Sequence, residues 1–172
     1  MSQNRARVPS LLALFLFVFS SACQAASPSL GGSREVGQPA PAFELASLTG
    51  ATVKLADQKG KVVLLDFWAT WCKPCETQAR IVEDVHRELA GKEVAIFALN
   101  SGEDKETVER FVAKKPFGYP VVLDPEDSLG VTLQIAALPA VLIVGKDGKV
   151  VFFREGIVDG PTLREELRKA GV

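Results

Sequence analysis

The chain has 172 residues, a length typical of one domain with or without a terminal extension. Hydrophobic residues make up 47% and charged residues 24%, which excludes a disordered or fibrous chain. Twenty Lys and Arg residues balance 21 Asp and Glu residues, which speaks against a nucleic-acid partner, and the single histidine excludes a metal site that needs two imidazoles from one chain.

The first 22 residues are expected to form a signal peptide. Arg5 and Arg7 supply positive charge, an unbroken apolar run of nine residues covers 11–19, and small residues follow at 20–22. A membrane-spanning helix needs about 20 apolar residues, so the run is too short to span. Charge, short apolar run and small residues in this order are typical of a secretory signal.

Cys23 directly follows Ala22 and resembles the cysteine of the bacterial lipoprotein cleavage box, which becomes the lipidated first residue. The alternative is ordinary cleavage after Ala25 or Ala26, which would discard Cys23. Residues 23–35 are rich in small and polar types and are predicted to form a flexible tether. The folded domain is expected over residues 36–172.

Two short extended pieces, 43–45 and 52–55, flank Thr49-Gly50 and predict a hairpin. The run 62–67 (VVLLDF) is nearly all apolar and predicts a strand buried on both faces. Helical spacing of apolar residues over 73–90 predicts the first helix. A second buried strand is expected at 94–99 (VAIFAL).

Helical spacing returns over 104–115, and a short strand at 119–123 is expected near a sheet edge because of its prolines. Strands at 140–144 and 150–154, joined by a Lys-Asp-Gly turn, predict an antiparallel hairpin. Pro161 is expected to open a final helix. This order predicts an α/β fold, with a mixed central sheet and helices on both faces.

Cys72 and Cys75 lie three positions apart where the buried strand gives way to the first helix. That spacing places both thiols on one face of the helix, within disulfide reach. The positive end of the helix dipole favours a thiolate, and the Lys73 cation lowers a nearby thiol pKa further. Pro74 sets helical backbone without donating an amide. Cys72, at the exposed end of the turn, is predicted to attack a substrate disulfide, and Cys75 to release the product.

Two other interpretations of the cysteine pair are weaker. A structural disulfide across three residues closes almost no loop and stabilises little. A zinc site needs two further ligands, and the sequence has no second cysteine pair. Redox chemistry is therefore the interpretation that the spacing favours.

Asp66 interrupts the apolar run 62–67 and lies six residues before Cys72. A carboxylate inside such a strand is desolvated, which raises its pKa. We expect Asp66 to accept the proton of the buried Cys75 thiol; the alternative is a strand-end aspartate that faces water.

The stretch from Asp66 to Cys75 (DFWATWCKPC) resembles the thioredoxin active site, and the wider chain resembles the TlpA/ResA-like branch of extracytoplasmic thiol–disulfide oxidoreductases. The matching segments are 37–43 (GQPAPAF), 119–124 (YPVVLD), 138–140 (LPA) and 147–150 (DGKV). The resemblance covers about residues 36–172. It implies a thioredoxin-like fold with an N-terminal β-hairpin and an inserted helix–strand unit.

The resemblance also implies roles for individual residues. Cys72 is the nucleophile, Cys75 the resolving thiol and Asp66 the buried carboxylate. Pro139 is expected to be cis and to face the dithiol, where its backbone pairs with substrate. Substrate contacts are implied for four residues: Trp71, Pro74, Leu138 and Pro139.

Three positions depart from the family pattern. Many relatives carry Asn where Asp66 stands, and Glu where this chain has Gln78, so the carboxylate has the thioredoxin placement. Arg80 replaces a helix proline, which predicts a less kinked first helix. These differences put a specific pathway such as cytochrome c maturation in doubt, and they leave the dithiol chemistry intact.

The expected function is exchange of a dithiol for a disulfide with exported proteins, acting as a reductant, without a cofactor or metal. The implied partners are disulfide-bearing or dithiol-bearing extracytoplasmic proteins and an upstream membrane electron donor, with membrane attachment through Cys23. A thiol peroxidase is disfavoured because Leu65 and Ala69 occupy the positions of a peroxiredoxin Pro and Thr. A copper-delivery module is the alternative, but His86 lies about 16 Å along the helix from Cys75.

Overall fold

The computed structural model describes Met1 and residues 34–172, and it confirms an α/β fold built on one mixed sheet. In the described part of the chain the sheet has seven strands in the order β2-β1-β5-β4-β3-β6-β7. The strands are β1 (Glu44–Ser47), β2 (Thr52–Lys54), β3 (Val62–Trp68), β4 (Val94–Ser101), β5 (Val121–Asp124), β6 (Ala140–Val144) and β7 (Val150–Glu155). The helices are α1 (Cys75–Glu88), α2 (Lys105–Val112), α3 (Ser128–Thr132) and α4 (Gly160–Lys169), with a 3-10 turn η1 (Leu55–Gln58).

The strand β3 lies at the centre of the core, and all seven of its residues are buried. It pairs in parallel with β4 and antiparallel with β6, so its backbone is hydrogen-bonded on both sides. Side chains alternate between the two faces of a strand. Leu64 and Trp68 accordingly belong to one hydrophobic cluster, and Leu65 and Phe67 to the other.

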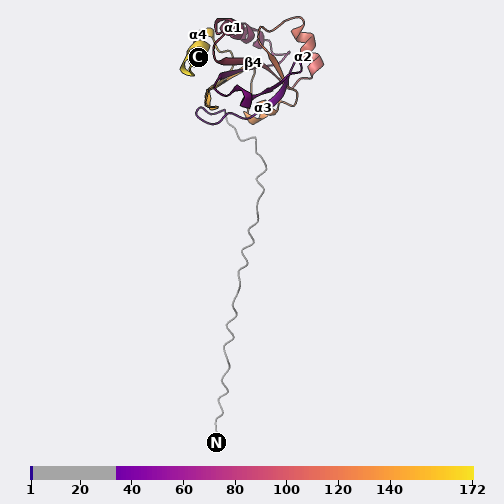
Figure 1. Cartoon of the computed structure of the whole chain (residues 1–172). Helices are drawn as coiled ribbons and strands as arrows, with labels where there is room; N and C mark the ends of the chain where they lie inside the picture. The colour runs from indigo at the N-terminus through magenta and orange to yellow at the C-terminus, as the bar shows by residue number, and fades with distance from the viewer. Residues whose placement is uncertain (2–33) are drawn as a thin grey trace.

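Helices cover both faces of the sheet, as predicted (Figure 1). The face of Leu64 is covered by α1 and α4, which place Val82 and Leu163 in that cluster. The opposite face is covered by α3 through Leu129. The first of these clusters also contains the cysteine pair, so the packing of α1 on β3 positions the redox motif.

The predicted N-terminal hairpin is confirmed, with Leu45 opposite Val53. The expectation that the third strand lies near an edge is wrong. β5 is interior, between β4 and β1, and its four residues are all buried. The hairpin adds β1 to the outer side of β5, and Pro120 precedes the strand, so no ladder donor is missing from it.

The short helix α3 was not predicted, because five residues including Gly130 are too few for a periodic pattern. It depends on Asp124 at the end of β5, which is 1% exposed. One carboxylate oxygen accepts hydrogen bonds from the backbone N and hydroxyl of Ser128, and the other accepts one from Leu129 N. This side chain caps the helix and satisfies amides that have no partner within the helix.

Apart from Met1, the predicted signal peptide (1–22) lies outside the described residues, as do Cys23 and most of the predicted tether (23–35). Arg34, near the end of that tether, is docked on the domain: its Nη1 donates to the Gln134 carbonyl at 2.7 Å, and its guanidinium lies over the Phe153 ring. Among the described residues, no helix is long and apolar enough to cross a membrane.

Candidate active site

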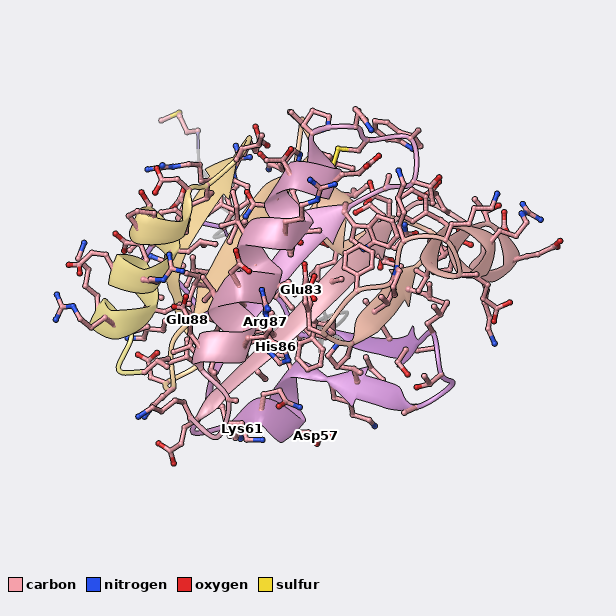
Figure 2. The ribbon with its side chains drawn as sticks, turned by 90° about the horizontal axis from the view of Figure 1, so that it is seen from above. Asp57, Lys61, Glu83, His86, Arg87 and Glu88 are labelled. Atoms are coloured by element: carbon pink, nitrogen blue, oxygen red, sulfur yellow. A yellow bond between two sulfur atoms is a disulfide. The ribbon has the colours of Figure 1, made fainter. Side chains whose placement is uncertain are left out.

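Cys72 and Cys75 form a disulfide at the N-terminal end of α1 (Figure 2), with their Cα atoms 5.4 Å apart. Pro74 lies immediately before the helix in helical conformation, and its carbonyl accepts hydrogen bonds from the amides of Thr77 and Gln78. The predicted placement of the dithiol at a helix start is therefore confirmed. The fixed backbone of Pro74 suits this position, because it continues directly into the helix.

The two cysteines are equally buried in the disulfide form, at 4% and 3% exposure. The expectation that Cys72 occupies an exposed end of the turn is therefore wrong for this state. The turn folds back on itself, since Cys72 N donates to the Ala69 carbonyl and Cys75 N donates to the Cys72 carbonyl. The exposure of the two sulfurs therefore does not show which cysteine is the nucleophile. That assignment depends on their order at the start of the helix.

A cavity of about 280 Å³ adjoins the disulfide. Both cysteines line it, and three aromatic residues, Trp68, Phe111 and Phe117, form much of its apolar wall. The Trp68 ring packs against Phe117 at 4.6 Å and against Phe111 at 5.3 Å between centroids. The cavity joins the start of α1 to the end of α2 and offers an apolar recess beside the reacting sulfurs.

Two lysines share the Glu76 carboxylate beside this cavity. Glu76 accepts hydrogen bonds from Lys115 Nζ at 2.7 Å and from Lys73 Nζ at 3.1 Å, and these two cations hold the pKa of Glu76 below its ordinary value. Lys73 was predicted to lower the thiol pKa. The Lys73 side chain is 83% exposed and its ammonium pairs with the Glu76 carboxylate, so water and Glu76 both weaken the field of this cation at the sulfurs.

Asp66 is 1% exposed and lies on β3 between Leu64 and Trp68, on the face that carries the cysteine cluster. The expected desolvation is confirmed: burial raises the pKa of Asp66 to about 7, and a hydrogen bond from Tyr119 limits the rise. A carboxyl group with a pKa near neutrality can both take and return a proton at physiological pH.

The residues predicted to contact substrate differ in exposure. Trp71 is 73% exposed and Pro74 is exposed, whereas Leu138 is half-buried and Pro139 is buried. The Leu138–Pro139 peptide bond is cis, as predicted, and the Pro139 carbonyl accepts a hydrogen bond from Gly156 N at 2.7 Å. Trp71 and Pro74 therefore present open surface beside the disulfide.

Gln78 is fully buried on α1, one turn after Cys75. Its Oε1 accepts a hydrogen bond from Val158 N at 2.7 Å, which ties the segment between β7 and α4 to α1. Gln78 Nε2 has no hydrogen-bond partner among the described residues. Gln78, which stands where many relatives carry Glu, therefore holds the segment before α4 against α1.

Sequence reasoning missed two residues at the site, Tyr119 and Glu103. Tyr119 is the hydrogen-bond donor to Asp66. Glu103, just after β4, accepts hydrogen bonds from Thr70 N and from Asn100 Nδ2, both at 2.7 Å. It thereby fixes the loop that leads into Trp71 and Cys72. Glu103 lies outside the matching segments, and the match over 119–124 gives no indication that Tyr119 contacts Asp66. The contacts of Glu103 with Thr70 and of Tyr119 with Asp66 span 33 and 53 positions of sequence.

Among the described residues, no group of three or more His, Cys, Asp and Glu side chains is placed to hold a metal ion. His86, the single histidine of the chain, is half-buried on α1, and its ring faces that of Tyr119 at 6.0 Å between centroids. It therefore packs at the edge of the core.

A thioredoxin-like sheet with a Cys-Lys-Pro-Cys disulfide at the start of the first helix defines a thiol–disulfide oxidoreductase. The chain belongs to the AhpC/TSA family, whose model matches residues 36–153, and within it to the ResA-like oxidoreductases. It is 34% identical to the thiol-disulfide oxidoreductase ResA of Geobacillus thermodenitrificans over 134 residues, which cover 78% of this chain and 75% of that protein.

A second relative, the thiol-disulfide oxidoreductase ResA of Bacillus anthracis, is 37% identical over 77% of this chain and 75% of its own length. Among solved structures, a putative thiol:disulfide interchange protein DsbE from Chlorobium tepidum superposes with a TM-score of 0.73 at 28% identity. That superposition covers 79% of this chain and 97% of the Chlorobium chain, so the fold is shared over almost the whole described domain.

Proposed function

We propose that the protein is an exported reductant of protein disulfides. In this reaction Cys72 attacks the substrate disulfide, Cys75 resolves the mixed disulfide, and Asp66 accepts the proton of the Cys75 thiol. The observation that carries the proposal is the disulfide at the start of α1 on the same face of the sheet as the buried Asp66. Trp71 and Pro74 offer the exposed surface that receives the partner chain, and the backbone at Leu138 and Pro139 is the part of the site that pairs with it.

The positions of the two cysteines support the division of roles. Cys72 precedes α1, where the amides at the helix start stabilise a thiolate. Cys75 is the first residue of the helix, on the side of the core that holds Asp66. A proton acceptor is needed at Cys75, because a thiolate attacks a disulfide and a buried thiol is slow to ionise alone.

The reducing direction rests on the two residues between the cysteines. Lys73 and Pro74 include no histidine, the residue found there in strong oxidants. We expect the Cys72–Cys75 couple to lie near the low end of the range of roughly −270 to −120 mV known for such proteins. Equilibration of the protein with glutathione buffers, read by mass after alkylation, measures this potential. A value near the upper end of that range would mean that the protein oxidises its partners instead.

Export and membrane attachment form the second part of the proposal. They rest on the signal-like segment 1–22 and on Cys23 directly after it. We propose that the domain is placed outside the cytoplasm and anchored by a lipid on Cys23. A membrane-bound electron donor then reduces the Cys72–Cys75 disulfide back to the dithiol after each turnover. A single acyl chain anchors weakly, so a stable anchor needs more than one chain.

Expression of the full chain in a bacterial host that processes lipoproteins tests the anchor. We expect the mature protein to begin at an acylated Cys23, detected by mass spectrometry, and to fractionate with membranes. Cys23→Ser is the matched control, because it removes the acceptor sulfur and leaves the signal segment unchanged. An unmodified protein that begins at Ala26 or Ser27 contradicts the anchor and leaves export intact.

A further inference from the structure

Tyr119, the single tyrosine of the chain, is buried beneath α1, with 5% of its surface exposed. Its hydroxyl donates a hydrogen bond of 2.8 Å to Asp66 Oδ2. The two residues are 53 positions apart, one on the central strand and the other just before β5. No part of the dithiol motif requires a phenol at this point, so the contact calls for a separate explanation.

The ring of Tyr119 is held from two sides. Phe117 packs edge-on against it at 5.5 Å between centroids, and the His86 ring of α1 lies 6.0 Å away. The Glu83 side chain covers the neighbouring Gly118, where a Cβ atom would come within 2.8 Å of a Glu83 oxygen. Figure 2 shows Glu83 and His86 on the same helix, below the end that carries the disulfide. The phenol therefore approaches Asp66 from a fixed direction.

The hydrogen bond makes the two oxygens of Asp66 different. Oδ2 accepts from Tyr119, while Oδ1 is buried and has no hydrogen-bond partner among the described residues. Burial and the nearby Asp66 charge raise the pKa of Tyr119 above its ordinary value, so the phenol keeps its proton. It can donate to Oδ2 whether or not Oδ1 carries a proton, because the unprotonated oxygen of a carboxylic acid still accepts.

We propose that Tyr119 is the positioning residue of the proton acceptor: it occupies Oδ2 and so directs the proton of the Cys75 thiol to Oδ1 of Asp66. This inference rests on the proposed role of Asp66 in the resolving step. In that step the Cys75 S–H proton moves to Oδ1. The Cys75 thiolate then attacks the Cys72 sulfur, the Cys72–Cys75 bond forms, and the bond from Cys72 to the partner breaks.

The atoms and electrons of this step balance within the dithiol and the partner. The dithiol loses two electrons as its disulfide forms, and the partner disulfide, opened in the first step, gains them as two thiols. The departing partner sulfur leaves as a thiolate, and the proton held on Oδ1 of Asp66 is available to it. Tyr119 exchanges no proton in this sequence; its hydrogen bond orients Asp66 and lowers the pKa of that carboxyl.

The pH dependence of the resolving step is set by the groups that surround Asp66. The pKa of Asp66 responds to burial and to the Tyr119 hydroxyl. From α1, Cys75 belongs to the cluster on the same face of the sheet as Asp66, His86 packs against Tyr119, and Glu83 lies over Gly118 with its charge close enough to act on Tyr119. A hydrogen bond to the charged form of a carboxylate lowers its pKa, so loss of the hydroxyl raises the pKa of Asp66 further.

The test is Tyr119→Phe in the reduced protein, reacted with the probe disulfide 5,5′-dithiobis(2-nitrobenzoate) in a stopped-flow instrument. The first thionitrobenzoate release reports attack by Cys72, and the second reports resolution by Cys75. We expect the second rate to rise with pH in the wild-type protein as Asp66 ionises. In the variant the midpoint of that rise moves up by about one to two pH units, and the first rate is unchanged.

Two further variants keep the outcomes distinct. His86→Gln changes the titratable ring beside Tyr119 and keeps the hydroxyl, so its midpoint is expected to match wild type. Asp66→Asn tests the proposed function itself. If Asp66→Asn slows the second release and Tyr119→Phe leaves its midpoint in place, the positioning role is wrong and the proton acceptor stands. If Asp66→Asn leaves the second release unchanged, the proton acceptor is wrong and the positioning role falls with it.

Discussion

Replacement of Cys75 by serine is expected to stop turnover and to trap the partner as a mixed disulfide on Cys72. The serine hydroxyl cannot attack the mixed disulfide, so the reaction halts after its first bond exchange. Incubation of reduced Cys75→Ser with an extract of oxidised exported proteins should yield larger species on a non-reducing gel, and a reductant should release them. The same adducts, cut out and sequenced, would identify the partner proteins.

Cys72→Ser is the matched control, because it alters the same disulfide and leaves the other sulfur. It is expected to trap nothing. The rate of alkylation of the reduced wild-type protein by iodoacetamide, followed against pH, gives an independent measurement. We expect it to give a thiol pKa below about 7.5 for Cys72. Two cysteines that react equally, each near the free thiol value of about 8.5, would contradict the division of roles.

Strongly patterned segments explain why most of the fold was predictable. The apolar run at 62–67 leaves no solvent face, and a strand buried on both faces belongs at the centre of a sheet. The position of β5 was not predictable from its own residues. Pro120, directly before it, suggests an edge strand, and only the pairing of Ala46 with Leu123, far apart in sequence, places β5 inside the sheet.

Some residues of the candidate site could likewise be predicted from local sequence, and others come from distant parts of the chain. The cysteine pair and Asp66 lie within ten consecutive residues, and local spacing relates them to a strand end and a helix start. Tyr119 and Glu103 reach the site from the ends of other strands. Their contacts depend on sheet order and on the direction of single side chains, which no periodic pattern carries.

Asp66→Asn is expected to give a slower and more stable protein. The amide keeps an oxygen acceptor for Tyr119, so the substitution removes the charge and the proton site with little change of shape. Loss of a general base of this kind typically costs 10²–10⁴-fold (a range of roughly that size) in the step that it serves. We expect the loss in the release of the mixed disulfide, with the first attack by Cys72 unchanged.

The stability effect has a definite pH dependence. Burial raises the pKa of Asp66 from 3.8 to about 7 in the folded protein. Between these values the unfolded chain has lost a proton that the folded protein keeps, so the free energy of unfolding falls as pH rises and then levels above pH 7. That interval corresponds to about 4 kcal/mol of lost stability in the wild-type protein.

Asparagine does not titrate, so the free energy of unfolding of the variant does not fall over this pH interval. A buried amide N–H without a partner costs about 1–3 kcal/mol at every pH, which leaves a net gain of about 1–3 kcal/mol above pH 7 and a net loss of about 1–3 kcal/mol near pH 4. Urea unfolding of the oxidised proteins at pH 4, 6 and 8 measures the difference, free of thiol titration. A variant that is less stable at pH 8 and turns over at the wild-type rate would mean that Asp66 is held by its hydrogen bond for structure alone. The resolving thiol would then need another proton acceptor, and water or the region of Gln78 would be the remaining candidates.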